Sequence, residues 1–313
     1  MFTTIQNDYL SVTVTDLGAT LNRFVDRRTG IDIVLGFETE AEYLRNGGHL
    51  GATVGRNANR IKDAQFTLNG EVYHLAKNNN QNNLHSGPDG FSFKLFTLEE
   101  KTDTKLVYTY FSPDGESGFP GNLNVKVIYE LFEDTMTITY EGTTDKDTVL
   151  NMTSHAYFNL GDENILDETL MVATDKYSPT DEFAMTLDEV LDTHGTAYDF
   201  SAPRKIGENV AKLPTGIDNN YVYEEMGDKL IAVLSNDRLE LDVYSDMPDM
   251  HLYTGYGVGP YPGKYGQTYG RYQGVAMECQ YYPNAINYDR FIKPVLKVGE
   301  TRRNYIRYVV KAK

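Results

Sequence analysis

Segments in which apolar and polar residues alternate dominate the chain. Between Leu123 and Leu131 every second residue is apolar and the intervening ones are mostly polar, and the pattern resumes from Met136 to Tyr140. A period of two is typical of a strand with one buried face. Because a short stretch containing Glu133 and Asp134 separates the two runs, they predict a β-hairpin.

A second hairpin is marked by Asn69 and Gly70. These residues separate the runs Ala64–Leu68 and Glu71–Leu75. An Asn-Gly pair readily supplies the two positive φ values that a type I′ turn requires. The pair therefore predicts a tight turn between two antiparallel strands.

The alternation of apolar and polar residues predicts several more strands, and few segments show helical periodicity. The further predicted strands are Ser11–Thr15, Ile31–Leu35, Leu106–Phe111, Leu230–Leu234, Leu239–Tyr244 and Tyr305–Val310. Helical periodicity is confined to Glu40–Arg45 and Ile206–Val210. Many strands separated by Gly, Pro, Asn and Asp clusters predict an all-β fold, a large antiparallel sandwich or barrel. No linker or repeat divides the chain, so residues 1–313 are expected to form a single domain.

The amino-acid composition excludes some classes of partner and indicates a cellular compartment. The chain has 29 Lys and Arg against 45 Asp and Glu, and a net charge of −16 argues against nucleic acid or anionic membrane partners. The single Cys279 excludes an internal disulfide and a Cys-rich zinc site. Residues 1–8 lack an export leader and no apolar run approaches the roughly 18 residues of a membrane span. We expect a cytoplasmic protein, with monomer and homodimer both open.

His85 is the first candidate for chemistry. It lies in Asn82–Pro88, a segment whose Asn and Gly residues disfavour a strand interior, so His85 is expected on a loop or strand end. Taken alone, the segment favours the simpler interpretation, an incidental exposed histidine in an Asn-rich turn.

His155 lies in a segment of mixed character, Asn151–Leu160. Its neighbours Tyr157 and Phe158 are core-forming, whereas Ser154 is polar. A polar group in an apolar stretch is unfavourable unless it is hydrogen-bonded, so His155 should have a partner. A catalytic histidine and a core histidine satisfied by the backbone both remain open.

Glu278 interrupts an apolar run that begins at Gln273 and continues to Pro283. Burial would raise the pKa of this carboxyl group, which suits a general base working near neutral pH. Taken alone, however, the segment favours a strand-end glutamate that faces solvent.

Two further segments contain groups suited to binding hydroxyls. Gly55–Arg60 contains Arg56, Asn59 and Arg60, whose guanidinium and amide groups fit hydroxyl recognition or, more simply, a solvated basic turn. Asp218 follows a glycine turn, where it either binds a ligand or caps the turn.

The sequence offers no metal or nucleotide motif. The six histidines show no H-x-x-x-H spacing, and the glycines form no phosphate-binding loop. No cofactor and no metal are therefore expected.

Read in order, the segments around Arg60, His85, His155, Asp218 and Glu278 resemble the motifs of the aldose 1-epimerase (galactose mutarotase) family. Those motifs are G-R-x-A-N-R, N-x-L-H-G-G, N-H-x-Y-F-N-L, G-x-D-H and E-x-Q-x-x-P. Each motif is weak by itself, whereas all five in this order are specific. The resemblance implies a large antiparallel β-sandwich of the galactose-mutarotase type. It also implies interconversion of the α and β anomers of a free aldose of the galactose or glucose type.

The resemblance also implies roles for individual residues. Glu278 would be the general base and His155 the general acid. His85 would assist at the ring oxygen, and Arg60 and Asp218 would bind substrate hydroxyls.

Three positions depart from the family pattern. Ser86 replaces the usual second glycine after the histidine, and Asn219 replaces the usual histidine after the aspartate. His251 lies just before Tyr253, near a position where the family often has a sugar-contacting Gln, so His251 is a further candidate for substrate binding. These changes affect the choice of sugar more than the reaction.

The chemistry needs no cofactor. Opening a cyclic aldose removes a proton from the anomeric hydroxyl and adds one to the ring oxygen, so one carboxylate and one imidazole suffice. A carboxylate close to His155 is expected to favour its charged form, so that activity falls at alkaline pH.

Two alternative functions remain. A non-catalytic carbohydrate-binding or sugar-sensing module would bind sugar without accelerating anomer exchange. An epimerase for a phosphorylated sugar or a disaccharide would need a larger or more basic site, and Arg56 and Arg60 are the only evident basic cluster. Glycoside hydrolysis fits less well, because it usually needs two facing carboxylates.

Overall fold

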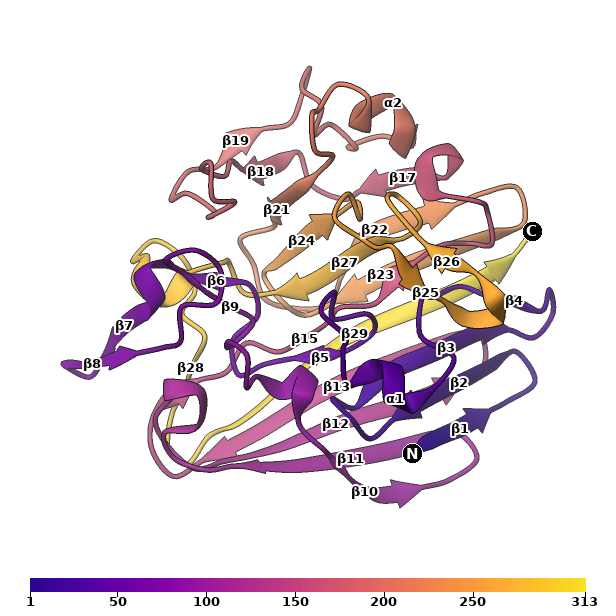
Figure 1. Cartoon of the computed structure of the whole chain (residues 1–313). Coiled ribbons are helices and arrows are strands. Elements are labelled where there is room, and N and C mark those ends of the chain that lie inside the picture. Colours follow the sequence, from indigo (N-terminus) through magenta and orange to yellow (C-terminus); the bar gives the residue numbers. More distant parts are fainter.

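A nine-stranded antiparallel sheet runs across the molecule (Figure 1) in the computed structural model, which describes residues 1–313. Its strands, in spatial order, are β10 (Thr97–Lys101), β11 (Lys105–Ser112), β12 (Leu123–Phe132), β13 (Thr135–Thr144), β29 (Thr301–Ala312), β23 (Leu239–Ser245), β22 (Lys229–Ser235), β17 (Thr169–Val172) and β20 (Arg204–Lys205). The predicted β12–β13 hairpin is confirmed. The last strand of the sequence, β29, lies in the middle of the sheet between β13 and β23.

Two smaller sheets complete the main framework. The six-stranded sheet contains β16 (Tyr157–Phe158), β27 (Val275–Gln280), β24 (Asp249–Tyr253), β21 (Asp218–Val222), β18 (Lys176–Ser178) and β19 (Leu191–Asp192). The four-stranded sheet contains β1 (Phe2–Gln6), β2 (Leu10–Thr15), β3 (Thr20–Asp26) and β4 (Ile31–Asp32).

Short strand pairs and turns connect the sheets. The pairs are β5 (Thr53–Val54) with β15 (Thr153–Ser154), β6 (Arg60–Ile61) with β9 (Asn83–Leu84), β7 (Gln65–Leu68) with β8 (Glu71–His74), β14 (Thr148–Val149) with β28 (Val295–Leu296), and β25 (Tyr261–Pro262) with β26 (Thr268–Tyr269). The helices are α1 (Glu40–Tyr43) and α2 (Ile206–Val210), and 3₁₀ turns span Lys62–Ala64, Phe91–Phe93, Glu116–Gly118, Ile165–Asp167, Lys264–Gly266 and Ala285–Asn287. Neither helix has the length and hydrophobicity needed to cross a bilayer.

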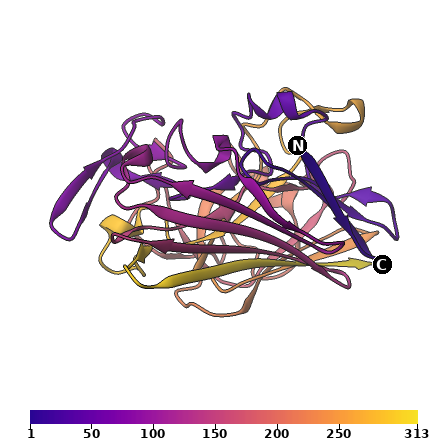
Figure 2. The same ribbon diagram turned by 90° about the horizontal axis from the view of Figure 1, so that it is seen from below.

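The alternation seen in the sequence explains how the sheets pack. On β12 the apolar residues Val125, Val127 and Tyr129 are buried and belong to a core cluster of 51 buried residues. Phe158 and Met277, from the six-stranded sheet, belong to the same cluster, so the inner faces of the sheets share one core. The predicted all-β antiparallel sandwich is confirmed, and the view turned by 90° shows its long strands edge-on (Figure 2).

Two local predictions have different outcomes. The β7–β8 turn is confirmed, with φ of 51° at Asn69 and 83° at Gly70. The predicted strand Ile31–Leu35 was wrong beyond Asp32, because the chain there changes partners. The N–H of Ile33 still donates to β3, but that of Leu35 donates to Tyr157 in the six-stranded sheet.

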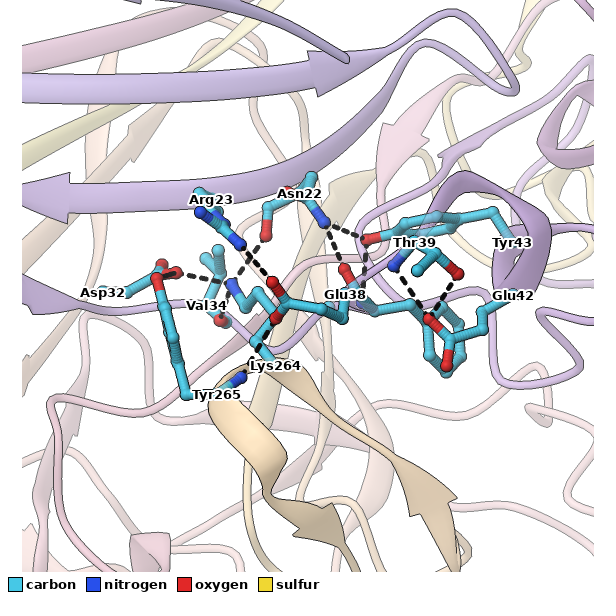
Figure 3. Close-up of polar contacts among 12 residues, drawn as sticks. Asn22, Arg23, Asp32, Val34, Glu38, Thr39, Glu42, Tyr43, Lys264 and Tyr265 are labelled. Carbon is cyan, nitrogen blue, oxygen red and sulfur yellow. Dashed lines mark hydrogen bonds and ion pairs between the residues drawn. The ribbon is translucent and has the colours of Figure 1, made fainter. Parts of the chain in front are cut away.

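The β25–β26 hairpin is joined to β3 and β4 by one buried lysine (Figure 3). The side chain of Lys264 is 1% exposed, and its ammonium donates to the carbonyl oxygens of Asn22 (2.6 Å) and Val34 (2.8 Å) and to the Asp32 carboxylate (2.7 Å). The three donor protons are therefore all used. Tyr265, the next residue, donates its hydroxyl to Asp32 (3.0 Å). The hairpin is thus held by a charge that is itself fully hydrogen-bonded.

Replacing Lys264 with Met should reduce the free energy of unfolding by about 3–5 kcal/mol, because the buried Asp32 carboxylate would lose its cation. Urea unfolding followed by circular dichroism measures this change. The double variant Lys264→Met/Asp32→Asn should recover part of the loss, since no uncompensated charge remains. Lys205→Met, which breaks an exposed ion pair with Asp167, serves as the matched control. A Lys264→Met effect as small as the control would contradict the prediction.

Candidate active site

A cavity of about 250 Å³ opens at the six-stranded sheet and is lined by all the residues singled out from the sequence except Arg56. Its lining includes Asn59, Arg60, His85, His155, Asp218, His251 and Glu278. These residues come from segments more than 200 positions apart. The folded chain therefore brings the predicted site residues together, while their roles remain predictions.

Three neighbouring strands carry the acidic residues of the cavity and their histidine partner. Glu278 lies on β27, His251 on β24 and Asp218 on β21. Glu278 on β27 lies directly opposite His251 on β24, so both side chains point to the same face of the sheet. Met277 and Cys279, on either side of Glu278, point into the core because side chains alternate along a strand. Glu278 is 1% exposed, so the solvent-facing interpretation of its segment was wrong.

His155 is held in place mainly through its backbone. It lies between β15 and β16, donates its N–H to Ala52 (2.9 Å) and accepts the N–H of Gly51 (3.0 Å). Its Nε2 atom lies 3.5 Å from a carboxylate oxygen of Glu278, and its Nδ1 atom is buried without a hydrogen-bond partner. The imidazole can therefore exchange a proton at Nε2, on the side of the carboxylate.

His85 is a neutral hydrogen-bond donor. The backbone N–H of Asn59 donates to His85 Nδ1 (3.1 Å), so Nδ1 holds a lone pair and the ring proton is on Nε2. Burial lowers the pKa of His85 well below its usual range. His85 lies at the end of β9 with φ of 52°, which confirms the prediction of a strand-end position.

Arg56 and Arg60 have different functions although they are four residues apart. Arg60 donates Nε to the side chain of Asn79 (2.9 Å), and its remaining guanidinium nitrogens have no hydrogen-bond partner in the protein. Arg56 is 1% exposed and donates to Ser112 and to the Pro120 carbonyl, among other acceptors outside the cavity. Neither interpretation of this segment, hydroxyl recognition or a solvated basic turn, applies to Arg56, whose buried guanidinium joins loops.

Burial separates the acidities of the two cavity carboxylates. Burial raises the pKa of Glu278 well above its usual range, and the charge of Asp218 raises it further. Burial acts to raise the pKa of Asp218 too, but the hydrogen bond from His251 (2.6 Å) and the charges of His251 and Arg60 lower it overall. Asp218 is thus the permanent anion and Glu278 the stronger base.

The charge state of His155 differs from the sequence prediction. Burial, together with the charge of the neighbouring His49, lowers the pKa of His155 to about 3. The expectation that a nearby carboxylate would keep this imidazole charged was wrong, because loss of hydration outweighs the attraction. His155 is therefore neutral near neutral pH, and Glu278 keeps its proton to a higher pH than an exposed glutamate does.

The ligand chemistry of the cavity does not fit a metal ion. Ligand atoms of His85, His155 and Glu278 lie within 4.8 Å of one another, and two histidines with a glutamate are a common zinc set. However, the Asn59 N–H occupies Nδ1 of His85, which leaves the proton on Nε2 and no lone pair there for a metal. The set fits proton transfer and hydrogen bonding instead.

Sequence reasoning missed His49, Tyr253 and Tyr261, which also line the cavity. Tyr261 belongs to the hairpin held by Lys264, and a side chain at Gly48 would meet its ring. For His49 the only signal in the sequence is its position directly after Gly47 and Gly48. Such a segment looks like an ordinary loop, so the sequence alone does not indicate a site.

Comparison with known proteins gives a consistent result. A family model described as Aldose 1-epimerase matches residues 1–309. The chain is 35% identical over 307 residues to galactose mutarotase of Sus scrofa, covering 95% of this chain and 90% of that protein. It is 31% identical over 325 residues to aldose 1-epimerase of Escherichia coli K12, covering 98% and 94%. The structure of a GalM/aldose epimerase homologue from C. elegans superposes with a TM-score of 0.94 at 26% identity, covering 100% and 99% of the two chains.

The tautomer of His85 can be tested directly. We expect long-range proton–nitrogen NMR spectra of the labelled protein to show Nδ1 unprotonated and Nε2 protonated, with no titration near the ordinary value of 6.5. The His85→Gln variant assigns the signals. A ring protonated on Nδ1 would contradict the arrangement.

Proposed function

This chain belongs to the aldose 1-epimerase family and interconverts the anomers of a free aldose, and from that premise we propose that Glu278 and His155 carry out the proton transfers. The observation that carries the proposal is a buried carboxylate and a buried imidazole 3.5 Å apart. The anomeric and ring oxygens of a hemiacetal are bonded to the same carbon, so two groups this close can serve both.

The proposed reaction conserves protons within the site. Glu278, as carboxylate, takes the proton of the anomeric hydroxyl while His155, as imidazolium, gives its Nε2 proton to the ring oxygen. The bond between C1 and the ring oxygen breaks, and C1 becomes an aldehyde. Rotation about the C1–C2 bond presents the other face of the aldehyde, and the same two transfers in reverse close the ring.

Burial supports this direction of proton transfer. The reacting form of the pair is the less populated one, a carboxylate and an imidazolium, and after ring opening the pair is a carboxylic acid and a neutral imidazole. The cavity favours the second state, because it raises the pKa of Glu278 and lowers that of His155 to about 3. The same low dielectric that opposes the ion pair therefore helps to move its proton onto the sugar.

The other cavity residues are assigned to binding. The Nε2–H group of His85 donates a hydrogen bond to the ring oxygen of the sugar. The guanidinium N–H groups of Arg60 donate hydrogen bonds to its hydroxyls. The Asp218 carboxylate accepts hydrogen bonds from substrate hydroxyls. His251 acts through Asp218, because its Nε2 is bonded to that carboxylate and its Nδ1 is buried without a partner. His251 is thus a positioning residue.

The charges of the cavity support a free sugar of the galactose or glucose type over a phosphorylated one. Arg60 is the only lysine or arginine among the lining residues, and it lies with the carboxyl groups of Asp218 and Glu278. A phosphate dianion would be poorly matched there. A purely sugar-binding module would gain nothing from a buried acid and base that share one proton.

Glu278→Gln and His155→Asn should each reduce anomer exchange by at least about 10²-fold, the usual contribution of a positioned acid or base. Polarimetry of freshly dissolved α-D-galactose measures the rate. The exposed residues Glu182 and His194 provide matched controls, Glu182→Gln and His194→Asn, whose rates should equal that of the parent. A parent-like rate in a folded Glu278 or His155 variant would remove that residue from the mechanism.

The pH dependence should follow the shared proton. A second proton charges His155, whose pKa of about 3 places that loss of activity at strongly acid pH. Removal of the one proton held by the pair leaves no group to protonate the ring oxygen, so activity is lost. The raised pKa of Glu278 moves this loss of activity toward alkaline pH. We expect kcat/KM, measured by exchange NMR, to show no decline on acidification through 6.5 and to decline as the pH rises. An acid limb near 6.5 would contradict this assignment.

A further inference from the structure

A third imidazole, that of His49, lines the cavity and has no role in the proton transfers described above. His49 has φ of 54° and lies in a turn that is closed by Asn46. The Asn46 carbonyl accepts a hydrogen bond from the His49 N–H (3.1 Å). The Asn46 side chain donates to the Leu50 carbonyl and accepts from the Leu50 N–H. Gly51 then donates to the His155 carbonyl (3.0 Å). The turn thus holds His49 at a fixed distance from His155.

The hydrogen bonds of His49 determine which ring nitrogen is left as an acceptor. The hydroxyl of the buried Ser92 donates its only proton to the Thr53 carbonyl (3.2 Å). Ser92 Oγ must then accept from His49, so Nδ1 of His49 carries the ring proton (3.1 Å) and Nε2 carries a lone pair. Burial lowers the pKa of His49 to about 4, which keeps the ring neutral. His49 therefore has the opposite tautomer to His85.

His49 lies beside the two imidazoles that are assigned to the ring oxygen. Its ring stacks on that of His155, with centroids 5.8 Å apart and an interplanar angle of 29°, and it lies 4.9 Å from the ring of His85. Glu278, in contrast, approaches His155 at the Nε2 atom. His49 and Glu278 thus contact different parts of His155.

We propose that Nε2 of His49 accepts a hydrogen bond from the 6-hydroxyl of the bound sugar. The inference rests on the proposed function, in which His155 and His85 face the ring oxygen. A pyranose carries only two hydroxyls next to that oxygen: the anomeric hydroxyl, on C1, and the 6-hydroxyl, on the carbon attached to C5. Glu278 takes the first, so the acceptor beside the two imidazoles takes the second.

The proposal predicts a preference for aldohexoses with a free 6-hydroxyl. A pentopyranose or a 6-deoxy sugar lacks the donor and leaves the lone pair of His49 unpaired. A 6-phosphate would bring an anion, which has no proton to donate, against that lone pair.

D-galactose and D-fucose, which is 6-deoxy-D-galactose, differ only in this hydroxyl and provide the test. For the parent protein, KM should be about 3- to 10-fold higher for D-fucose, the usual contribution of one hydrogen bond, with similar kcat. In His49→Phe, which keeps a ring to stack on His155, KM for D-galactose should rise to the D-fucose value. The KM for D-fucose should not change. His194→Phe, at an exposed imidazole outside the cavity, should leave both sugars unaffected.

The outcomes separate this inference from the proposed function. Equal KM values for the two sugars in the parent would overturn the role of His49, even if His49→Phe failed to fold. An equal loss for both sugars in His49→Phe would also overturn it. A failure of the proposed function would differ, because the parent would then accelerate neither sugar or would be insensitive to Glu278→Gln.

Discussion

A carboxyl group and an imidazole held 3.5 Å apart, away from bulk water, are the interaction on which the structure of the site depends. Glu278 is buried because its neighbours on β27 belong to the core, and His155 is buried because its backbone pairs with residues 51 and 52. Neither group can become charged without a large loss of hydration energy. In the proposed mechanism, the hydroxylated substrate carries the proton between them.

The site obtains three different functions from one residue type. His85 is a donor because a backbone N–H occupies its Nδ1, His49 is an acceptor because a serine occupies its Nδ1, and His155 has no partner at Nδ1. Hydrogen bonds outside the cavity thus decide what each ring presents to the sugar.

Most of the fold could be predicted from the sequence because strands leave a periodic signal that is local. The β12–β13 and β7–β8 hairpins follow directly from alternation and from an Asn-Gly turn. The change of partners after Asp32 could not be predicted, since it depends on where β16 lies. For the same reason the sequence did not distinguish Arg56 from Arg60 or reveal His49, and it misjudged the charge of His155. Each of these properties depends on burial and on contacts between distant segments.

The central place of β29 in the large sheet has a consequence for the order in which the protein can be completed during synthesis. Residues 301–312 separate β13 from β23, so neither half of the sheet has its inner neighbour until these residues leave the ribosome. Until then two long apolar edges stay unpaired, and such edges invite association with other nascent chains. In the finished molecule β29 covers both of these edges.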